Sequence, residues 1–120
     1  MESNKGAKKY AEYKNFSLSS ETSRYKLNLD KENYAGTLVD SMFNTKTVNR
    51  ECVGKKFSTI DQDNDWQLTD SCAKQFLGGW WYGWCTDVNL NAPVTNTDSL
   101  MWSNWRKTTI VKSEMKMKWE

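Results

Sequence analysis

Two cysteines enclose the most aromatic stretch of this chain. Cys72 and Cys85 stand on either side of "AKQFLGGWWYGW", a segment that carries three tryptophans and is too broken by glycine to form a helix. A disulfide that closes a loop of this length would stabilise a small domain by about 3 kcal/mol in the chain-entropy description. Cys52 would then remain unpaired. The spacing alone also fits three reduced, buried thiols, so both interpretations stay open at this point.

Length and charge exclude several classes of protein. A chain of 120 residues suits one domain with one modest core. Its net charge of +2 comes from mixed acidic and basic residues, which argues against nucleic acid as a partner. No apolar run is long enough to span a bilayer. The polar start "MESNKGAKKY" lacks the apolar region of a signal peptide, which taken alone indicates a cytoplasmic or truncated protein.

Alternating patterns predict a few strands. Residues 1–9 are small and charged, and we expect them to be frayed or disordered. Residues 10–18 alternate aromatic and polar side chains, and residues 24–30 place Tyr25, Leu27 and Leu29 on one face. A polar turn, "SSETS", lies between these two segments. This pattern predicts an antiparallel hairpin with one buried face.

The rest of the chain shows little regular periodicity. Residues 37–43 fit either a short helix or a loop. Residues 110–119 end the chain with strict alternation in "EMKMKW", which predicts a terminal strand. Much of the segment 44–105 must therefore be loop, and a long loop region in a compact domain is usually functional or held by cross-links.

The stretch "DQDNDWQ" places three aspartates, Asp61, Asp63 and Asp65, at alternate positions. The same pattern opens the EF-hand calcium loop, but that motif then needs Gly at its sixth position and Glu at its twelfth. Trp66 and Cys72 occupy these positions here, so an EF-hand is excluded. Hard oxygen ligands at alternate positions still suit Ca²⁺. The alternative is a solvated acidic turn that holds no ion.

A succession of motifs then resembles one known family. "YAEYKNFSLSSETSRYKLNL", "FSTIDQDND" and "CAKQFLGGWWYGWC" follow one another in this order. Together they resemble the fibrinogen C-terminal (fibrinogen-like) globular domain of fibrinogen chains, ficolins, tachylectins, angiopoietins and tenascins. The resemblance implies an α+β fold with a small antiparallel sheet and a loop-rich calcium-binding subdomain, at about 57–105, stapled by a disulfide. It covers residues 10–119 as a partial domain, the C-terminal portion only.

The resemblance also implies roles for the acidic turn and the cysteines. Asp63 and Asp65 match the family's calcium-ligating aspartates, and Asp61 matches a preceding acidic residue. The implied cofactor is therefore Ca²⁺, with further backbone carbonyl ligands between residues 66 and 69. Cys72 and Cys85 match the family's disulfide. The family carries a cis peptide before the second cysteine, here Trp84–Cys85, although Trp84 stands where its members usually have Asn.

Lectin members of the family bind acetyl groups of N-acetylated sugars in a pocket beside this disulfide. By position, the corresponding ligand-binding residues here are Phe76, Trp84, Cys85, Thr86 and Asn96. The lectins have Tyr in place of Phe76, His in place of Thr86 and Tyr near Asn96. The resemblance also implies that Trp80, Trp81, Trp102 and Trp105 serve mostly in the core and in loop packing rather than in sugar stacking.

These observations lead to one main functional prediction and two alternatives. The main one is an extracellular, calcium-dependent recognition module, with a lectin for N-acetylated sugars as its specific form. One alternative is a protein–protein interaction module of the angiopoietin or tenascin kind, which binds a cell-surface or extracellular-matrix protein. The other is a truncated domain without retained binding. An enzyme is not expected, because the chain has no His and no nucleophile paired with a base.

Two further residues receive predictions. Asn15 opens an "NFS" sequon, which predicts N-glycosylation if the protein is secreted. Cys52 has no family partner, so it is either free or a cross-link to another chain in an oligomer.

Overall fold

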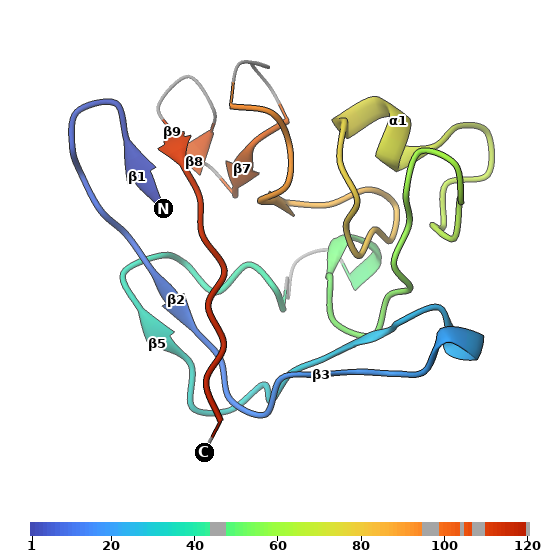
Figure 1. Ribbon diagram of the computed structural model, residues 1–120, viewed down its shortest axis with the longest axis horizontal. Helices are drawn as coiled ribbons and strands as arrows, with labels where there is room; N and C mark the ends of the chain where they lie inside the picture. Colours follow the sequence, from blue (N-terminus) through green and yellow to red (C-terminus); the bar gives the residue numbers. More distant parts are fainter. Residues whose placement is uncertain (44–47, 95–98, 104, 107–109, 120) are drawn as a thin grey trace.

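The computed structural model describes residues 1–43, 48–94, 99–103, 105–106 and 110–119. Regular elements in these ranges are short and joined by loops (Figure 1). In chain order they are β1 (Glu2–Ser3), β2 (Ala11–Glu12), β3 (Ser17–Leu18), the 3₁₀ helix η1 (Glu21–Ser23), β4 (Leu27–Asn28), β5 (Ala35–Gly36), the 3₁₀ helix η2 (Val48–Arg50), α1 (Cys72–Phe76), β6 (Val88–Asn89), β7 (Met101–Trp102), β8 (Trp105–Arg106) and β9 (Ile110–Lys112).

The strands form four small antiparallel sheets. β1 pairs with β9, β2 with β5 and β3 with β4, whereas β6, β7 and β8 form a three-stranded sheet in that order. β1 and β9 lie side by side although they come from opposite ends of the chain (Figure 1). The predicted α+β class with small antiparallel sheets is confirmed. No helix in the described part is long and apolar enough to cross a membrane.

The predicted hairpin is present as β3 and β4, with Ser17 facing Asn28 and Leu18 facing Leu27. Its turn contains η1, and Arg24 follows with a φ of 57°. Tyr25 also has a positive φ, 54°. The expected continuous apolar face is therefore not formed, because left-handed backbone interrupts the pleat before Leu27.

Both ends of the chain differ from the expectation. β1 pairs with β9 where a frayed start was expected, and Ser3 Oγ accepts the backbone N–H groups of Lys5 and Ala7. At the other end, strand structure stops at Lys112. The residues beyond it, 113–119, continue as a chain that lies outside the described sheets, so only the first part of the predicted terminal strand is formed.

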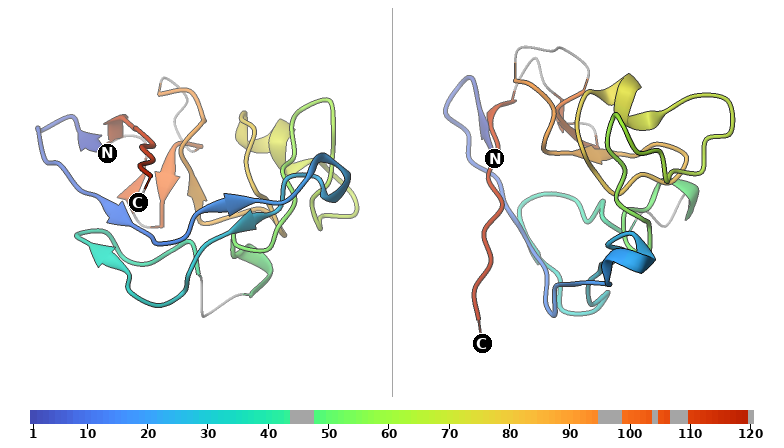
Figure 2. Two further views of the ribbon diagram at one scale, coloured as in Figure 1. Left: turned by 60° about the horizontal axis from the view of Figure 1, so that its bottom comes forward. Right: turned by 45° about the vertical axis from the view of Figure 1, so that its right-hand side comes forward.

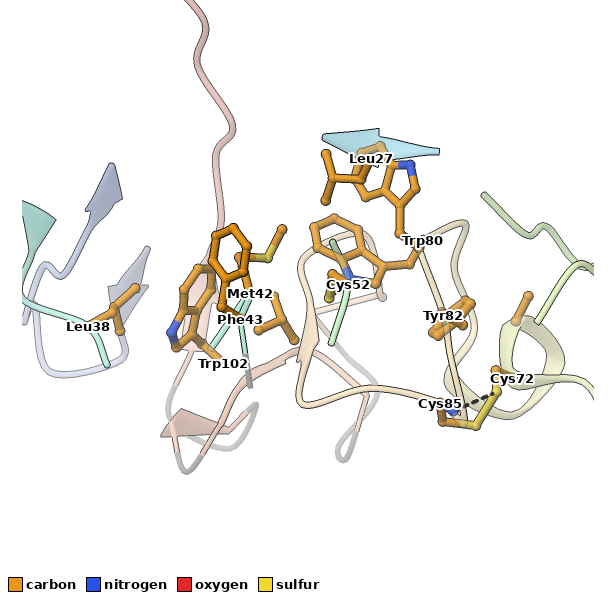
Figure 3. Packing of buried hydrophobic residues seen from close by; sticks show 13 residues of the cluster. Leu27, Leu38, Met42, Phe43, Cys52, Cys72, Trp80, Tyr82, Cys85 and Trp102 are labelled. Atoms are coloured by element: carbon orange, nitrogen blue, oxygen red, sulfur yellow. Dashed lines mark hydrogen bonds between the residues drawn. A yellow bond between two sulfur atoms is a disulfide. The ribbon is translucent and has the colours of Figure 1, made fainter. Parts of the chain in front are cut away.

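The larger of two buried hydrophobic clusters in the described residues is rich in aromatic side chains and connects β4, β6 and β7 to the loops. Leu27 from the hairpin packs near Trp80, and Trp102 from β7 packs near Phe43 (Figure 3). The buried members of this cluster are Leu27, Leu38, Met42, Phe43, Cys52, Cys72, Ala73, Trp80, Trp81, Tyr82, Cys85, Val88 and Trp102. The prediction that the tryptophans serve mainly as core residues holds for Trp80, Trp81 and Trp102.

Candidate functional site

A pair of backbone hydrogen bonds holds the acidic turn to the tryptophan-rich segment. Ser58 N–H donates to Trp80 O at 2.9 Å, and Trp80 N–H donates to Ser58 O at 3.1 Å. The buried Ser58 hydroxyl then accepts the N–H of Asn64 at 2.9 Å, and the Asn64 amide donates to Phe57 O at 2.8 Å. These contacts fix where the turn begins, so the aspartates that follow have defined positions.

Asp65 lies at the centre of the acidic turn. Its Oδ1 accepts the N–H of Gln67 at 2.9 Å, and its Oδ2 accepts the N–H of Cys72 at 2.8 Å. Asp63 Oδ1 accepts the N–H of Asp65 at 3.1 Å. Asp65 therefore ties the turn to the first residue of α1, and Asp63 lies beside it.

Asp61 belongs to a different arrangement. Its Oδ1 accepts the hydroxyl proton of Thr59 at 2.7 Å, and this bond lowers the pKa of the Asp61 carboxyl. Within the described residues, no three His, Cys, Asp or Glu side chains gather into a metal-binding group. The structure thus brings together two of the three predicted ligands and leaves Asp61 apart from them.

The electrostatics of Asp65 bear on whether this pair suits a cation. Burial raises the pKa of the Asp65 carboxyl, and the neighbouring Asp63 carboxylate raises it further, whereas the N–H groups of Cys72 and Gln67 oppose the shift. Two carboxylates that disfavour each other's charge are relieved by a cation between them. Their hard oxygen donors, with carbonyls and water, fit the chemistry of Ca²⁺.

The disulfide between Cys72 and Cys85 is present, as predicted, and it joins the start of α1 to the end of the tryptophan-rich loop (Figure 3). The Cys85 N–H donates to Cys72 Sγ at 3.1 Å, and Gly83 N–H donates to Cys85 O at 3.1 Å.

The expected cis peptide before Cys85 is wrong for this chain, since no peptide bond in the described part is cis. Cys85 instead has a φ of 54°, and the Trp84 N–H donates to Asn49 O at 2.6 Å. A trans peptide followed by a left-handed residue is enough to turn the chain here.

The residues of the implied acetyl pocket lie in different environments in the structure. Phe76 is half-buried and stacks on Tyr82, with 6.3 Å between the ring centroids. Thr86 is fully buried, and its hydroxyl donates to Val88 O at 2.7 Å. Cys85 has its N–H engaged within the disulfide, as described above. Trp84 is exposed, and Asn96 lies outside the described residues. Of the described members, only Trp84 presents a large side chain to solvent.

Trp66 and Leu68 belong to the segment 66–69, which was expected to supply backbone carbonyls to calcium, but no role was predicted for their side chains, which are exposed. Trp66 N–H donates to Gly83 O at 3.0 Å, which brings its backbone next to that of Trp84. The Trp66 and Trp84 side chains are 46% and 47% exposed, and Leu68 is 89% exposed. The Lys55 ammonium lies 4.3 Å from the centre of the Trp66 ring. The only feature of the sequence that could have indicated this exposed apolar surface is Trp66, an apolar residue directly after the acidic run.

Asn15 and Cys52, the two other residues with predicted roles, differ in their exposure to solvent. Asn15 is exposed, and its amide donates to Asp30 Oδ2 at 2.6 Å. Cys52 is fully buried and accepts a hydrogen bond from Trp80 Nε1 at 3.2 Å. The suggested cross-link through Cys52 does not fit the folded chain, because a second chain cannot reach a sulfur inside the core.

Comparisons with known proteins agree with this architecture. The sequence matches the family "Fibrinogen beta and gamma chains, C-terminal globular domain" over residues 1–120. The chain belongs to the fibrinogen C-terminal domain family. Among curated relatives of this fibrinogen-like chain, human angiopoietin-related protein 7 is 34% identical over 127 residues, which cover 98% of the chain and 34% of the relative. Chicken tenascin is 34% identical over 119 residues, covering 95% of the chain and 6% of the relative.

Solved structures show the same relationship. The fibrinogen-like globe domain of human ANGPTL2 superposes on this fibrinogen-like chain with a TM-score of 0.66 and 37% identity, covering 82% of the chain and 41% of that structure. A lamprey fibrin D-dimer in complex with the peptide Gly-His-Arg-Pro-amide gives a TM-score of 0.67 at 26% identity, covering 84% and 37%. The chain thus spans well under half the length of these relatives.

Proposed function

We propose that this fibrinogen-like chain is an extracellular protein-recognition module rather than an enzyme or a sugar-specific lectin. The observation that carries the proposal is the exposure of two tryptophans, Trp66 and Trp84, which stand on neighbouring backbone segments beside the disulfide. Exposed Trp is enriched at the energetic centres of protein interfaces. The relatives point the same way, since they include angiopoietin-related proteins, a tenascin and a fibrin structure with a bound peptide.

The buried polar groups of the implied acetyl pocket favour this assignment over the lectin. Thr86 and the Cys85 N–H already have partners inside the chain. A sugar would have to displace these bonds, which removes the advantage of a preorganised polar pocket. The exposed apolar side chains of Trp66, Leu68 and Trp84 instead suit an extended segment of a protein partner.

We further propose that Asp63 and Asp65 hold a structural Ca²⁺ ion. When bound, the ion would supply positive charge next to the two carboxylates and so reduce their mutual repulsion. Asp65 would keep the Cys72 N–H oriented, and Asp63 would keep the backbone of the turn in place. The role of these residues is to position the loop that carries Trp66, not to carry out chemistry.

The recognition proposal is tested by probing arrays of extracellular ectodomains and matrix proteins with the labelled chain. A glycan array that includes N-acetylated sugars is probed in parallel. Replacing both Trp66 and Trp84 with Ala should weaken protein binding by at least about 100-fold, as expected for two interface tryptophans. Val39→Ala, at a site that is 72% exposed and belongs to another loop, is the matched control.

Three results would contradict the recognition proposal. They are binding restricted to N-acetylated glycans, protein binding unchanged by loss of both tryptophans, and absence of any binding by a folded chain. The first would restore the lectin interpretation, and the last would indicate a domain without retained binding.

The calcium proposal predicts a higher melting temperature when Ca²⁺ is present, because an ion that binds only the folded state stabilises it. At about 100 times its Kd, Ca²⁺ should raise the Tm by roughly 5–10 °C. Asp65→Asn keeps an acceptor for the Cys72 N–H but removes the charge, so it should abolish this increase. Asp61→Asn should retain the increase, because Asp61 is bonded to Thr59 away from the pair. An equal response in both variants would contradict the assignment.

A further inference from the structure

Oxygen atoms that can accept hydrogen bonds surround the two sulfurs of the Cys72–Cys85 disulfide. Gln67 Oε1 lies 3.1 Å from Cys85 Sγ and 3.5 Å from Cys72 Sγ. Gly83 O lies 3.8 Å from Cys72 Sγ, and Gln75 Oε1 lies 3.9 Å from Cys85 Sγ. A disulfide has no S–H group to donate to these oxygens, whereas a thiol has one. Each thiol of the reduced pair would therefore meet an acceptor that is already in place.

This arrangement favours the reduced state of the pair. In the disulfide, Gln67 Oε1 only touches the two sulfurs. After reduction the same oxygen accepts a hydrogen bond from an S–H group, so the reduced chain gains an interaction that the oxidised chain lacks. A disulfide whose reduced form is stabilised by its surroundings is easier to reduce than one whose surroundings favour neither form.

The loop around Cys85 is also held by contacts that do not involve the disulfide. On one side, the Trp84 N–H donates to Asn49 O at 2.6 Å. On the other side, Arg50 Nη2 donates to Thr86 O at 2.7 Å. Both partners belong to η2, so the loop stays attached to this element when the disulfide opens.

A reductant can reach the disulfide past flexible side chains at the surface. α1, which begins at Cys72, lies on the side of the molecule away from both termini (Figure 2). Cys72 is fully buried, whereas Cys85 is 7% exposed. Gln67 and Gln75, which contact Cys85 Sγ, are half-buried and exposed, respectively. Surface side chains of this kind change rotamer within nanoseconds, so Cys85 Sγ becomes accessible without movement of the backbone.

We propose that Cys72 and Cys85 form a redox-responsive pair that opens while the domain stays folded. The reductant is a dithiol, and one of its thiolates attacks Cys85 Sγ. A sulfur–sulfur bond forms between the reductant and Cys85, the bond between Cys85 and Cys72 breaks, and its electron pair passes to Cys72 Sγ, which then takes up a proton. The Cys85 N–H, 3.1 Å from Cys72 Sγ, stabilises the charge on that sulfur as it leaves. The second thiolate of the dithiol then attacks the mixed disulfide, so the dithiol is oxidised to its own disulfide and Cys85 takes up a proton as a free thiol.

Opening the pair changes the connection between the acidic turn and the loop that carries Trp84. The remaining links are hydrogen bonds: the Cys72 N–H donates to Asp65 Oδ2 at 2.8 Å, and the Trp66 N–H donates to Gly83 O at 3.0 Å. Without the covalent link, these hydrogen bonds open more often, and Trp66 and Trp84 are less fixed relative to each other. The redox state would thereby regulate the proposed recognition surface. This regulatory role rests on the proposed function, whereas reduction itself is measured without a partner and without Ca²⁺.

A redox titration of the full chain tests whether Gln67 favours the reduced pair. The wild type, Gln67→Met and the matched control Gln62→Met are equilibrated in EDTA with graded ratios of reduced to oxidised dithiothreitol. Their thiols are then alkylated in denaturant and counted by mass spectrometry. Gln67→Met removes the acceptor at a similar side-chain length, so half-reduction should need a ratio about 2- to 10-fold higher. Gln62 is exposed in the same turn, and its replacement should leave the midpoint unchanged.

The direction of the Gln67→Met shift distinguishes two roles for this residue. If Gln67 only shielded the disulfide or packed against it, its replacement would make reduction easier. A midpoint that is unchanged, or shifted toward easier reduction, would overturn the proposal. The same holds for a wild-type chain that loses its cooperative thermal transition in circular dichroism as soon as the pair is reduced.

Hydrogen exchange measures whether the opening is local. In the reduced chain, the amides of Trp66 and Cys72 should exchange faster by about tenfold or more, because they join the acidic turn to the disulfide loop. The amide of Trp80, which donates to the buried Ser58 O, should keep its rate. The double variant Cys72→Ser/Cys85→Ser cannot form the link and should reproduce this pattern. Faster exchange throughout the chain, or no change at Trp66 and Cys72, would contradict a local opening. An oxidised chain that binds no partner on the arrays would contradict the proposed function alone.

Discussion

Cys52 is the only thiol in the chain that is not in the disulfide, and its surroundings explain its behaviour. The sulfur is fully buried and lies within 3.4 Å of the Thr86 hydroxyl oxygen and 3.2 Å of Trp80 Nε1. Burial raises the pKa of the Cys52 thiol to about 11, although the hydrogen bonds to Thr86 and Trp80 act in the opposite direction. The thiolate is the reactive form of cysteine. Cys52 is therefore protected from chemical modification both by its buried position and because its thiol stays protonated.

We predict that the Cys52 thiol does not react with a thiol reagent such as DTNB at pH 8 in the folded chain. One thiol per chain should react after denaturation without reductant. Cys52→Ala should lower the free energy of unfolding by about 1–3 kcal/mol, because it leaves the buried Trp80 N–H without an acceptor. Cys52→Ser keeps an acceptor and should cost less. Rapid modification of the native chain would contradict the buried position.

The raised pKa of Cys52 also predicts how stability changes in alkali. The unfolded thiol ionises near its ordinary pKa of 9.0, and the folded one near 11, so the unfolded state loses its proton first. The free energy of unfolding should therefore fall between pH 9 and 11, by at most about 1.4 kcal/mol per pH unit from this group. Burial also raises the pKa of Tyr13 and Tyr82, which add to the decline. Denaturant titrations should show a smaller decline for Cys52→Ser.

Among single residues, the sequence was most informative where it specified covalent or apolar roles. It predicted both the Cys72–Cys85 pair and the core position of Trp80 through the family resemblance. It could not predict that Thr86 is buried, because a threonine in a loop is compatible with either environment. The hydrogen bond between Asp61 and Thr59 was equally hidden, because the alternate spacing of the aspartates does not indicate which of them bonds to a neighbouring side chain.

At the scale of elements, α1 (Cys72–Phe76) is the single α-helix in the described part, and it carries the disulfide at its first residue. Ser71 is its N-cap, and the Ser71 side chain accepts the N–H of Lys74 at 3.3 Å. Leu77 ends the helix in the left-handed conformation. So short a helix is not stable by itself, so its ends and cross-link determine whether it forms.

We predict that Ser71→Ala lowers the free energy of unfolding by about 1 kcal/mol, because the Lys74 N–H loses its acceptor. Ser71→Asp keeps an acceptor and should remain within about 0.5 kcal/mol of the wild type. Urea denaturation followed by tryptophan fluorescence measures both. A loss for Ser71→Asp equal to that for Ser71→Ala would show that the cap does not act through this hydrogen bond.

The elements also show why sequence patterns predict strands unevenly. The β3–β4 hairpin was foreseen because its two segments are neighbours in the chain and a polar turn joins them. The pairing of β1 with β9 was not, because no local pattern records a partner from the other end of the chain. Alternation in residues 113–119 signals a strand, yet a strand also needs a neighbour, which the described chain does not provide.

At the scale of the whole molecule, Gly83 lies where three separate loops meet. A Cβ atom at this position would lie 2.0 Å from Asn49 O and 2.7 Å from Lys55 Cε. The same Asn49 oxygen accepts the N–H of Trp84, and Gly83 O accepts the N–H of Trp66. The η2 region, the acidic turn and the disulfide loop are therefore packed through one residue that has no side chain.

We predict that Gly83→Ala lowers the free energy of unfolding by about 3 kcal/mol or more, because backbone atoms cannot move aside as a side chain can. Gly6→Ala is the matched control. It has a φ of 82° and open space around it, so it should cost only about 1–2 kcal/mol. Thermal denaturation of both variants in the same buffer makes the comparison. A Gly83→Ala chain as stable as Gly6→Ala would show that the loops can separate at little cost.

The pairing of Ser3 with Ile110 has a consequence for how the protein is made. Translation proceeds at about 5–20 residues per second, so β1 leaves the ribosome roughly 5–20 s before β9 has been synthesised. During that interval the first strand lacks its native neighbour, and the sheet of β1 and β9 can close only after β9 has emerged from the ribosome. A nascent chain of this kind depends on chaperones for longer than one whose strands pair in order.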